Sequence, residues 1–61
     1  MNQITKRAIE LWKNIPADQI GRMPHTYAIR EKLHSEFLNE SRARIGNCAM
    51  QAIRMIKAKS K

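Results

Sequence analysis

The chain has 61 residues, a net charge of +7 and 43 % hydrophobic residues, so we expect one small domain, residues 1–61, whose single core buries only about 60 % of the unfolded surface. The single cysteine, Cys48, excludes an internal disulfide and is typical of a reducing compartment. No apolar run reaches the roughly 20 residues of a membrane span and the first residues lack a secretory signal, so we expect a cytoplasmic protein with no membrane partner.

The first predicted helix covers about residues 3–14. Asn2 is suited to cap its start, and Pro16 ends it, because proline lacks an N–H and restricts the residue before it. Its apolar residues recur at offsets of 0, 4, 7, 8 and 11, which places them on one face of a helix. These residues are Ile4, Ala8, Leu11, Trp12 and Ile15. Trp12 belongs to this face, so we predict that it lies in the core and does not stack on a ligand.

Two further helices follow, and a proline precedes each. After Pro16 we expect a short helix of about two turns over residues 17–23, with Ile20 directed inward. Pro24 opens a longer helix that extends to about Leu38. This helix has apolar character on two sides, which is typical of a helix that is central in its fold or shared with a partner. One stripe is Ile29, Leu33 and Phe37, and the other is Tyr27, His34 and Leu38.

The segment around residues 39–41 leaves two alternatives open. Asn39 is suited to cap the end of one helix and Ser41 the start of the next. Alternatively, one helix runs from Pro24 to about Lys57. We favour a break, because an isolated rod of about 50 Å could not bury its faces. The last helix repeats the offsets of the first on the residues Ile45, Ala49, Ala52, Ile53 and Ile56.

The predicted fold is all-α, a small bundle of three or four helices with a helix-turn-helix-like arrangement. Gly46, inside the last helix, permits a close contact or marks a late start. We expect a dimer, because a core of this size gives marginal stability and self-association buries more surface. The predicted core residues are Ile4, Ala8, Leu11, Trp12, Ile15, Ile20, Ile29, Leu33, Phe37, Ile45, Ala49, Ile53 and Ile56.

The charge is distributed unevenly along the chain. Residues 1–40 hold six basic and five acidic side chains, whereas residues 41–61 hold six basic side chains and no acid. Such clustering indicates a polyanionic partner, although the basic tail 57–61 could instead be a solvated helix end. The candidates for phosphate contacts are Arg54, Lys57, Lys59 and Lys61.

Part of the sequence resembles a helix-turn-helix, with a Leu-Trp helix, a turn, a short Gln-Ile helix and a third helix of alternating apolar and basic residues. The residues that carry the resemblance are Leu11 and Trp12, Gln19 and Ile20, and Ala28 to His34. Over residues 11–34 the chain is similar to the start of GcrA-type cell-cycle regulators, whose third helix docks in the major groove of DNA. The resemblance implies a DNA-reading role for Thr26, Tyr27, Arg30 and His34. Arg30 has the bidentate fork that reads guanine edges.

We therefore expect a small DNA-binding protein, a transcriptional regulator or accessory factor of the kind that a phage or plasmid encodes, with duplex DNA as its partner. A homodimer would place two Pro24–Leu38 helices about 34 Å apart on a pseudo-palindromic site. Two alternatives stay open. One is a helical inhibitor or adaptor that docks a helix face on a partner protein. The other is binding of structured RNA, although the chain has only three aromatic residues to stack on bases.

Neither catalysis nor metal binding is expected. The soft ligands are His25, His34 and Cys48, and no pair has the i, i+4 spacing that places two imidazoles on one helix face. No glycine-rich phosphate loop occurs, and no Cys or Ser stands beside a suitable base and orienting carboxylate. The sequence therefore predicts no enzyme, no cofactor and no metal site.

Overall fold

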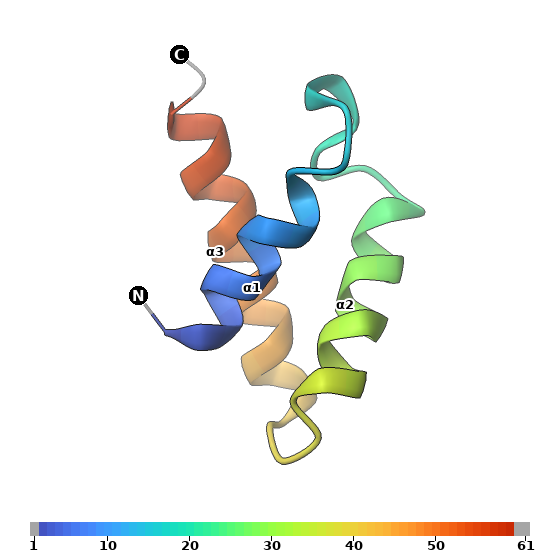
Figure 1. The fold of residues 1–61 in the computed structure, drawn as a ribbon, viewed down its shortest axis with the longest axis vertical. Coiled ribbons are helices and arrows are strands. Elements are labelled where there is room, and N and C mark those ends of the chain that lie inside the picture. Colours follow the sequence, from blue (N-terminus) through green and yellow to red (C-terminus); the bar gives the residue numbers. More distant parts are fainter. Residues whose placement is uncertain (1, 60–61) are drawn as a thin grey trace.

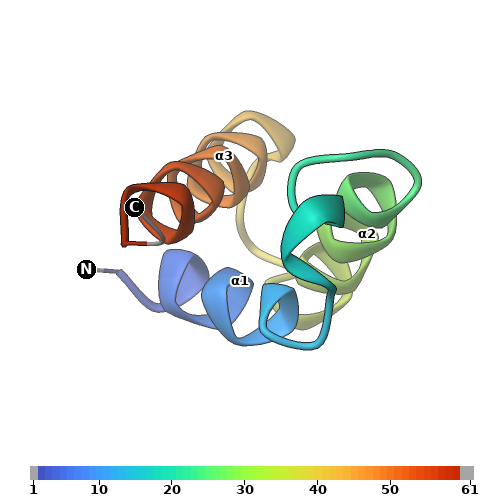
Figure 2. The ribbon, with the colours of Figure 1, turned by 90° about the horizontal axis from the view of Figure 1, so that it is seen from above.

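The computed structural model describes residues 2–59, which form three α-helices with one turn of 3₁₀ helix between the first two. These elements are α1, Gln3–Trp12; η1, Ala17–Gln19; α2, His25–Glu36; and α3, Arg42–Lys59. α2 and α3 run antiparallel, and α1 packs across the pair (Figure 1). Seen from above, the helices stand at the corners of a triangle (Figure 2), and each contacts the other two. The prediction of a small all-α bundle is confirmed. None of the helices in this range combines the length and apolar character that a membrane span requires.

Local signals at both ends determine the extent of α1. As predicted, the Asn2 side chain caps the helix, because its Oδ1 accepts a hydrogen bond from the Thr5 amide at 2.8 Å. The helix stops at Trp12, two residues before the predicted end. Pro16 disfavours helical backbone at Ile15. The chain tightens there into a turn in which the Ile15 amide donates to the Trp12 carbonyl at 3.0 Å.

The helical segment after Pro16 is shorter than predicted. Of the two turns expected over residues 17–23, the structure contains only Ala17–Gln19, so that prediction is wrong. Ile20 is already extended, with φ −64° and ψ 127°, and Gly21 has a positive φ of 88°. Glycine adopts this left-handed conformation at low cost, and it is the conformation that ends many helices. Ile20 nevertheless packs against the core, as predicted.

The chain breaks between α2 and α3, which is the alternative that the sequence favours. Ser41 caps α3, because its hydroxyl accepts a hydrogen bond from the Arg44 amide at 3.2 Å. The predicted role of Asn39 at the end of α2 is wrong, since the residue that closes this helix is Phe37. Phe37 leaves the helical region, with φ −118° and ψ 67°, and packs partly buried against the core. The turn therefore begins two residues before Asn39.

The core draws apolar side chains from all three α-helices. Trp12 is completely buried, which confirms its prediction as a core residue. Of the thirteen predicted core residues, eight are buried and the other five pack partly buried against them. The prediction omits three buried residues, which are Thr5, Cys48 and Ala52. Cys48 is a free thiol, and the Asn2 side-chain amide donates to its sulfur at 3.5 Å. This contact joins the start of α1 to the middle of α3.

The two glycines give a matched pair of stability predictions. A Cβ at Gly46, inside α3, would lie 3.5 Å from Arg30 Nη2, which is an ordinary van der Waals contact. We expect Gly46→Ala to raise the free energy of unfolding by about 0.5–1 kcal/mol through helix propensity. Gly21→Ala should lower it by about 1–2 kcal/mol, because the backbone there is left-handed. Urea unfolding followed by circular dichroism measures both, and a change of the same sign in the two variants would contradict the structure.

A buried hydroxyl gives a second stability prediction. Thr5 Oγ1 is buried and has no hydrogen-bond partner among the described residues. Thr5→Val replaces this hydroxyl with a methyl of similar shape, so we expect the free energy of unfolding to rise by about 1 kcal/mol. The control, Thr5→Ser, keeps the hydroxyl and removes a buried methyl, which should lower it by about 1 kcal/mol. Thermal unfolding compares the two variants, and a Val variant less stable than the Ser variant would refute this account.

Candidate functional site

Three of the four predicted site residues on α2 lie together on its outer face. Tyr27, Arg30 and His34 are spaced i, i+3 and i+7, which places them on one side of a helix. They line a shallow pocket of about 80 Å³ with Glu31 and Arg42. Arg42 is the first residue of α3, and its contribution was missed in the sequence prediction. The sequence signal for Arg42 is its position directly after Ser41: if the chain breaks between α2 and α3, Arg42 becomes the first residue of the last helix.

The Arg30 side chain lies across the boundary between α2 and α3. Its Nη2, Cζ and Nε atoms are 3.5, 3.8 and 3.9 Å from the position that a Cβ would occupy at Gly46. These nearly equal distances indicate that the plane of the guanidinium faces the glycine. An alanine at position 46 would meet this guanidinium at an ordinary van der Waals distance, so the contact does not require glycine. The N–H edges of a guanidinium packed by its face remain available for hydrogen bonds.

A row of residues spaced four apart leads from this pocket along α3. Arg42, Gly46, Met50 and Arg54 follow one another at this spacing, in a line that turns by about 40° around the helix at each step, so that Arg42 and Arg54 point about 120° apart. Met50 is 54 % exposed. Arg42 and Arg54 lie about 18 Å apart along the axis, at 1.5 Å per residue. We call the surface formed by Tyr27, Arg30, His34, Arg42, Met50 and Arg54 the α2–α3 flank.

Thr26, unlike the other predicted site residues on α2, uses its side chain to hydrogen-bond the preceding loop. It is half-buried, and its hydroxyl donates to the Arg22 carbonyl at 3.2 Å. The same carbonyl accepts from the Thr26 amide at 3.0 Å. Thr26 thus joins the start of α2 to the loop before it. Because this hydroxyl proton is already used, the structure does not offer Thr26 as a donor on the α2–α3 flank.

The basic residues at the end of α3 do not form one surface. Lys57 extends toward the loop before α2, with its Nζ 3.4 Å from the position of a Cβ at Gly21. Lys59 instead lines hollows beside α1 with Lys6 and Lys13. Two residues correspond to about 200° around a helix, which separates the two side chains. Lys57 and Lys59 thus project from different sides of α3, and Lys61 lies outside the described residues.

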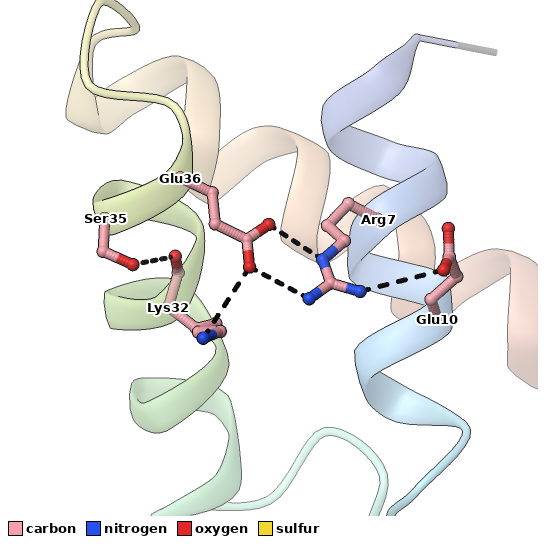
Figure 3. A network of polar contacts seen from close by, with 5 residues as sticks. All are labelled: Arg7, Glu10, Lys32, Ser35 and Glu36. Atoms are coloured by element: carbon pink, nitrogen blue, oxygen red, sulfur yellow. Dashed lines mark hydrogen bonds and ion pairs between the residues drawn. The ribbon is translucent and has the colours of Figure 1, made fainter.

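Most of the acidic side chains form ion pairs with cations that lie outside the α2–α3 flank. Arg7 of α1 donates two hydrogen bonds to the Glu36 carboxylate of α2, at 2.8 and 2.9 Å (Figure 3). Arg7 also lies 3.7 Å from Glu10, and Lys32 lies 3.9 Å from Glu36. At the start of α3, Glu40 pairs with Arg44 at 3.0 Å. The α1–α2 side of the bundle is thus largely neutralised.

The cations of the α2–α3 flank have no such partners. Within residues 2–59, Arg30, Arg42 and Arg54 form no ion pair. α3 itself carries no acidic residue, and the acid beside this surface is Glu31. The flank therefore combines three uncompensated guanidinium groups with an exposed tyrosine, of which 57 % is accessible.

Comparisons with known proteins give no relative for this arrangement: no family model matches the chain, and no curated protein and no solved structure matches it either. In the described part of the chain, no group of three or more His, Cys, Asp or Glu side chains is placed to hold a metal ion. A functional conclusion for this protein must therefore come from the chemistry of its own surfaces.

The Arg7–Glu36 pair makes stability depend on pH in a defined direction. The hydrogen bond from Arg7 lowers the pKa of Glu36 from its ordinary value. A carboxylate with a lowered pKa stabilises the fold above its unfolded pKa, and that contribution is lost as the pH falls through the folded pKa. We expect Glu36→Gln to be less stable than the natural protein near neutrality and equally stable at strongly acidic pH, measured by urea unfolding.

A substitution of Arg7, the other member of the ion pair, is the control for Glu36→Gln. Arg7→Gln should reproduce the acid dependence of Glu36→Gln, and the double variant should lose little more than either single variant. A stability difference between natural protein and Glu36→Gln that persists unchanged into strong acid would show that the pair does not act through ionisation.

Proposed function

We propose that the protein binds duplex DNA through its α2–α3 flank. The observation that carries this proposal is that Arg30, Arg42 and Arg54 form no ion pair in the described range, on a surface to which α3 contributes no acidic residue. A polyanion with closely spaced phosphates is the partner that such a surface attracts most strongly. A small transcriptional regulator or accessory factor would have this activity.

In this proposal, α2 approaches the major groove. A helix about 10–12 Å wide fits a groove of about 12 Å. The outer face of α2 would present Tyr27, Arg30 and His34 to the base edges. The Arg30 guanidinium lies beside Gly46, and its fork is suited to engage guanine O6 and N7. The resemblance over residues 11–34 to GcrA-type regulators supports the same helix as the reading element.

Arg42 and Arg54 would hold the protein on the phosphate backbone. Their separation of about 18 Å along α3 corresponds to about five base-pair steps along the duplex axis, at about 3.4 Å per step. Contacts of this kind fix position and orientation and carry no sequence information. A homodimer would place two copies of α2 on successive turns of a pseudo-palindromic site, about 34 Å apart.

A second candidate function is docking on a partner protein. The specific observation in its favour is that two large apolar side chains, Tyr27 on α2 and Leu38 in the turn after it, are not covered by the bundle. Tyr27 is 57 % exposed and Leu38 is 82 % exposed. Exposed side chains of this size are typical of a contact surface when they are contiguous. This candidate would make the protein a small helical inhibitor or adaptor.

Two triple variants of equal charge test the DNA proposal. Arg30→Gln/Arg42→Gln/Arg54→Gln removes three cations from the α2–α3 flank, and Lys6→Gln/Lys13→Gln/Lys59→Gln removes three from the opposite side of α3. We expect the first variant to bind duplex DNA more weakly and to flatten the slope of log affinity against log salt by about 2.7, because each phosphate contact contributes about 0.9. The second should keep most of the slope. Fluorescence anisotropy with a labelled duplex measures both.

The outcomes separate the candidates. Equal losses in the two triple variants would mean that binding has no defined surface, and the absence of binding at low salt would refute the DNA proposal. Arg30→Lys keeps the charge and removes the fork, so it should relax preference at one base position by about 1–3 kcal/mol. If Tyr27→Ala/Leu38→Ala abolishes function while the arginine variants retain it, protein docking is the correct account.

A further inference from the structure

A second surface, on the far side of α3 from Arg30, has different chemistry. The ends of α1 and α3 and the segment containing η1 enclose a pocket of about 330 Å³. This volume is at the lower end of the range for small-molecule sites, about 300–1,000 Å³. The apolar wall of the pocket is formed by Ile9, Trp12, Ile15, Ile20 and Ile56.

Two cations stand among these apolar side chains. Lys13 follows the end of α1 and Lys59 is the last residue of α3, and both line the pocket. Both are exposed, and neither forms an ion pair with any residue of the range 2–59. Glu10 lines the adjoining hollow and lies 3.7 Å from Arg7. Among residues 2–59, no acidic side chain lines the pocket itself.

The helix ends nearby do not cancel this charge. The C-termini of α1 and α3 each contribute about half a negative charge, whereas each lysine contributes a full positive one. The pocket therefore combines an apolar interior with a net positive rim. A ligand complementary to it needs an apolar body and an anionic head.

We propose that this pocket binds a small amphipathic anion, with an alkyl or aryl body against the isoleucines and a carboxylate or phosphate head between Lys13 and Lys59. DNA has no apolar body to place there. A second copy of the chain would bring the same lysines to a two-fold contact, where like charges repel. Walls from three separate chain segments, over the completely buried Trp12, enclose a small molecule better than they accept an extended surface.

Trp12 provides the reporter, because it is the only tryptophan in the chain and lines the pocket. We expect octanoate to change Trp12 fluorescence in a saturable way. Octanol, which lacks the charge, and octylamine, which reverses it, should bind at least about tenfold more weakly. Hexanoate, with two methylenes fewer, should also lose about tenfold, at about 0.8 kcal/mol per methylene.

Matched variants test the role of the lysines. Lys13→Gln/Lys59→Gln should weaken octanoate binding at least tenfold while octanol binding is unchanged. Lys32→Gln/Arg44→Gln removes the same charge at distant positions and should leave octanoate binding unaltered, with circular dichroism showing both variants folded. Equal affinity for octanoate and octanol, or equal losses in the two double variants, would overturn the proposal. So would tight binding of an acidic peptide that octanoate fails to displace. None of these outcomes depends on whether the α2–α3 flank binds DNA.

Discussion

The close packing of α1 against α3 is the constraint on which the rest of the structure depends. Small side chains make it possible: Ala8 on α1 and Cys48, Ala49 and Ala52 on α3 are all buried, and α1 and α3 share the most extensive contact between helices. Small residues let helix axes approach, and the large Trp12 then fills the space that remains. Asn2 reinforces the arrangement, because one side chain both caps α1 and contacts the Cys48 sulfur.

With α1 fixed in this way, α3 has two flanks of different character. The side that bears Gly46 receives the Arg30 guanidinium of α2, and long cationic side chains continue along it. The side that bears Lys59 faces α1 and a pocket between isoleucines. The same helix thus presents a polar, cationic surface in one direction and a mixed apolar and cationic one in another. The basic residues of α3, which look like part of a single basic block in the sequence, therefore lie on more than one side of the helix.

Local chemistry made much of the fold predictable, and long-range geometry accounts for the rest. Asn2, Pro16 and Ser41 act on the few residues beside them, so the limits of α1 and the start of α3 follow from the sequence. The left-handed Gly21 was harder to place, because glycine is tolerated inside short helices as well as at their ends. The Arg7–Glu36 pair joins residues 29 apart, which no periodicity in the sequence indicates. For the candidate site, the spacing of Tyr27, Arg30 and His34 was sufficient, but Arg42 joins them only because α3 returns antiparallel.

The distribution of charge argues against solubility as the sole purpose of the basic residues. A chain that needed only to remain dissolved would gain as much from cations spread over every face, with acids interspersed to limit their mutual repulsion. Here Arg7 pairs with Glu10 and Glu36, on the side of the bundle away from α3's arginines. Arg30 and Arg42 line one pocket, and the acid beside them is Glu31. Within residues 2–59 no ion pair joins Glu31 to either arginine. A polyanion bound there, as we propose, would supply phosphates as counter-charges.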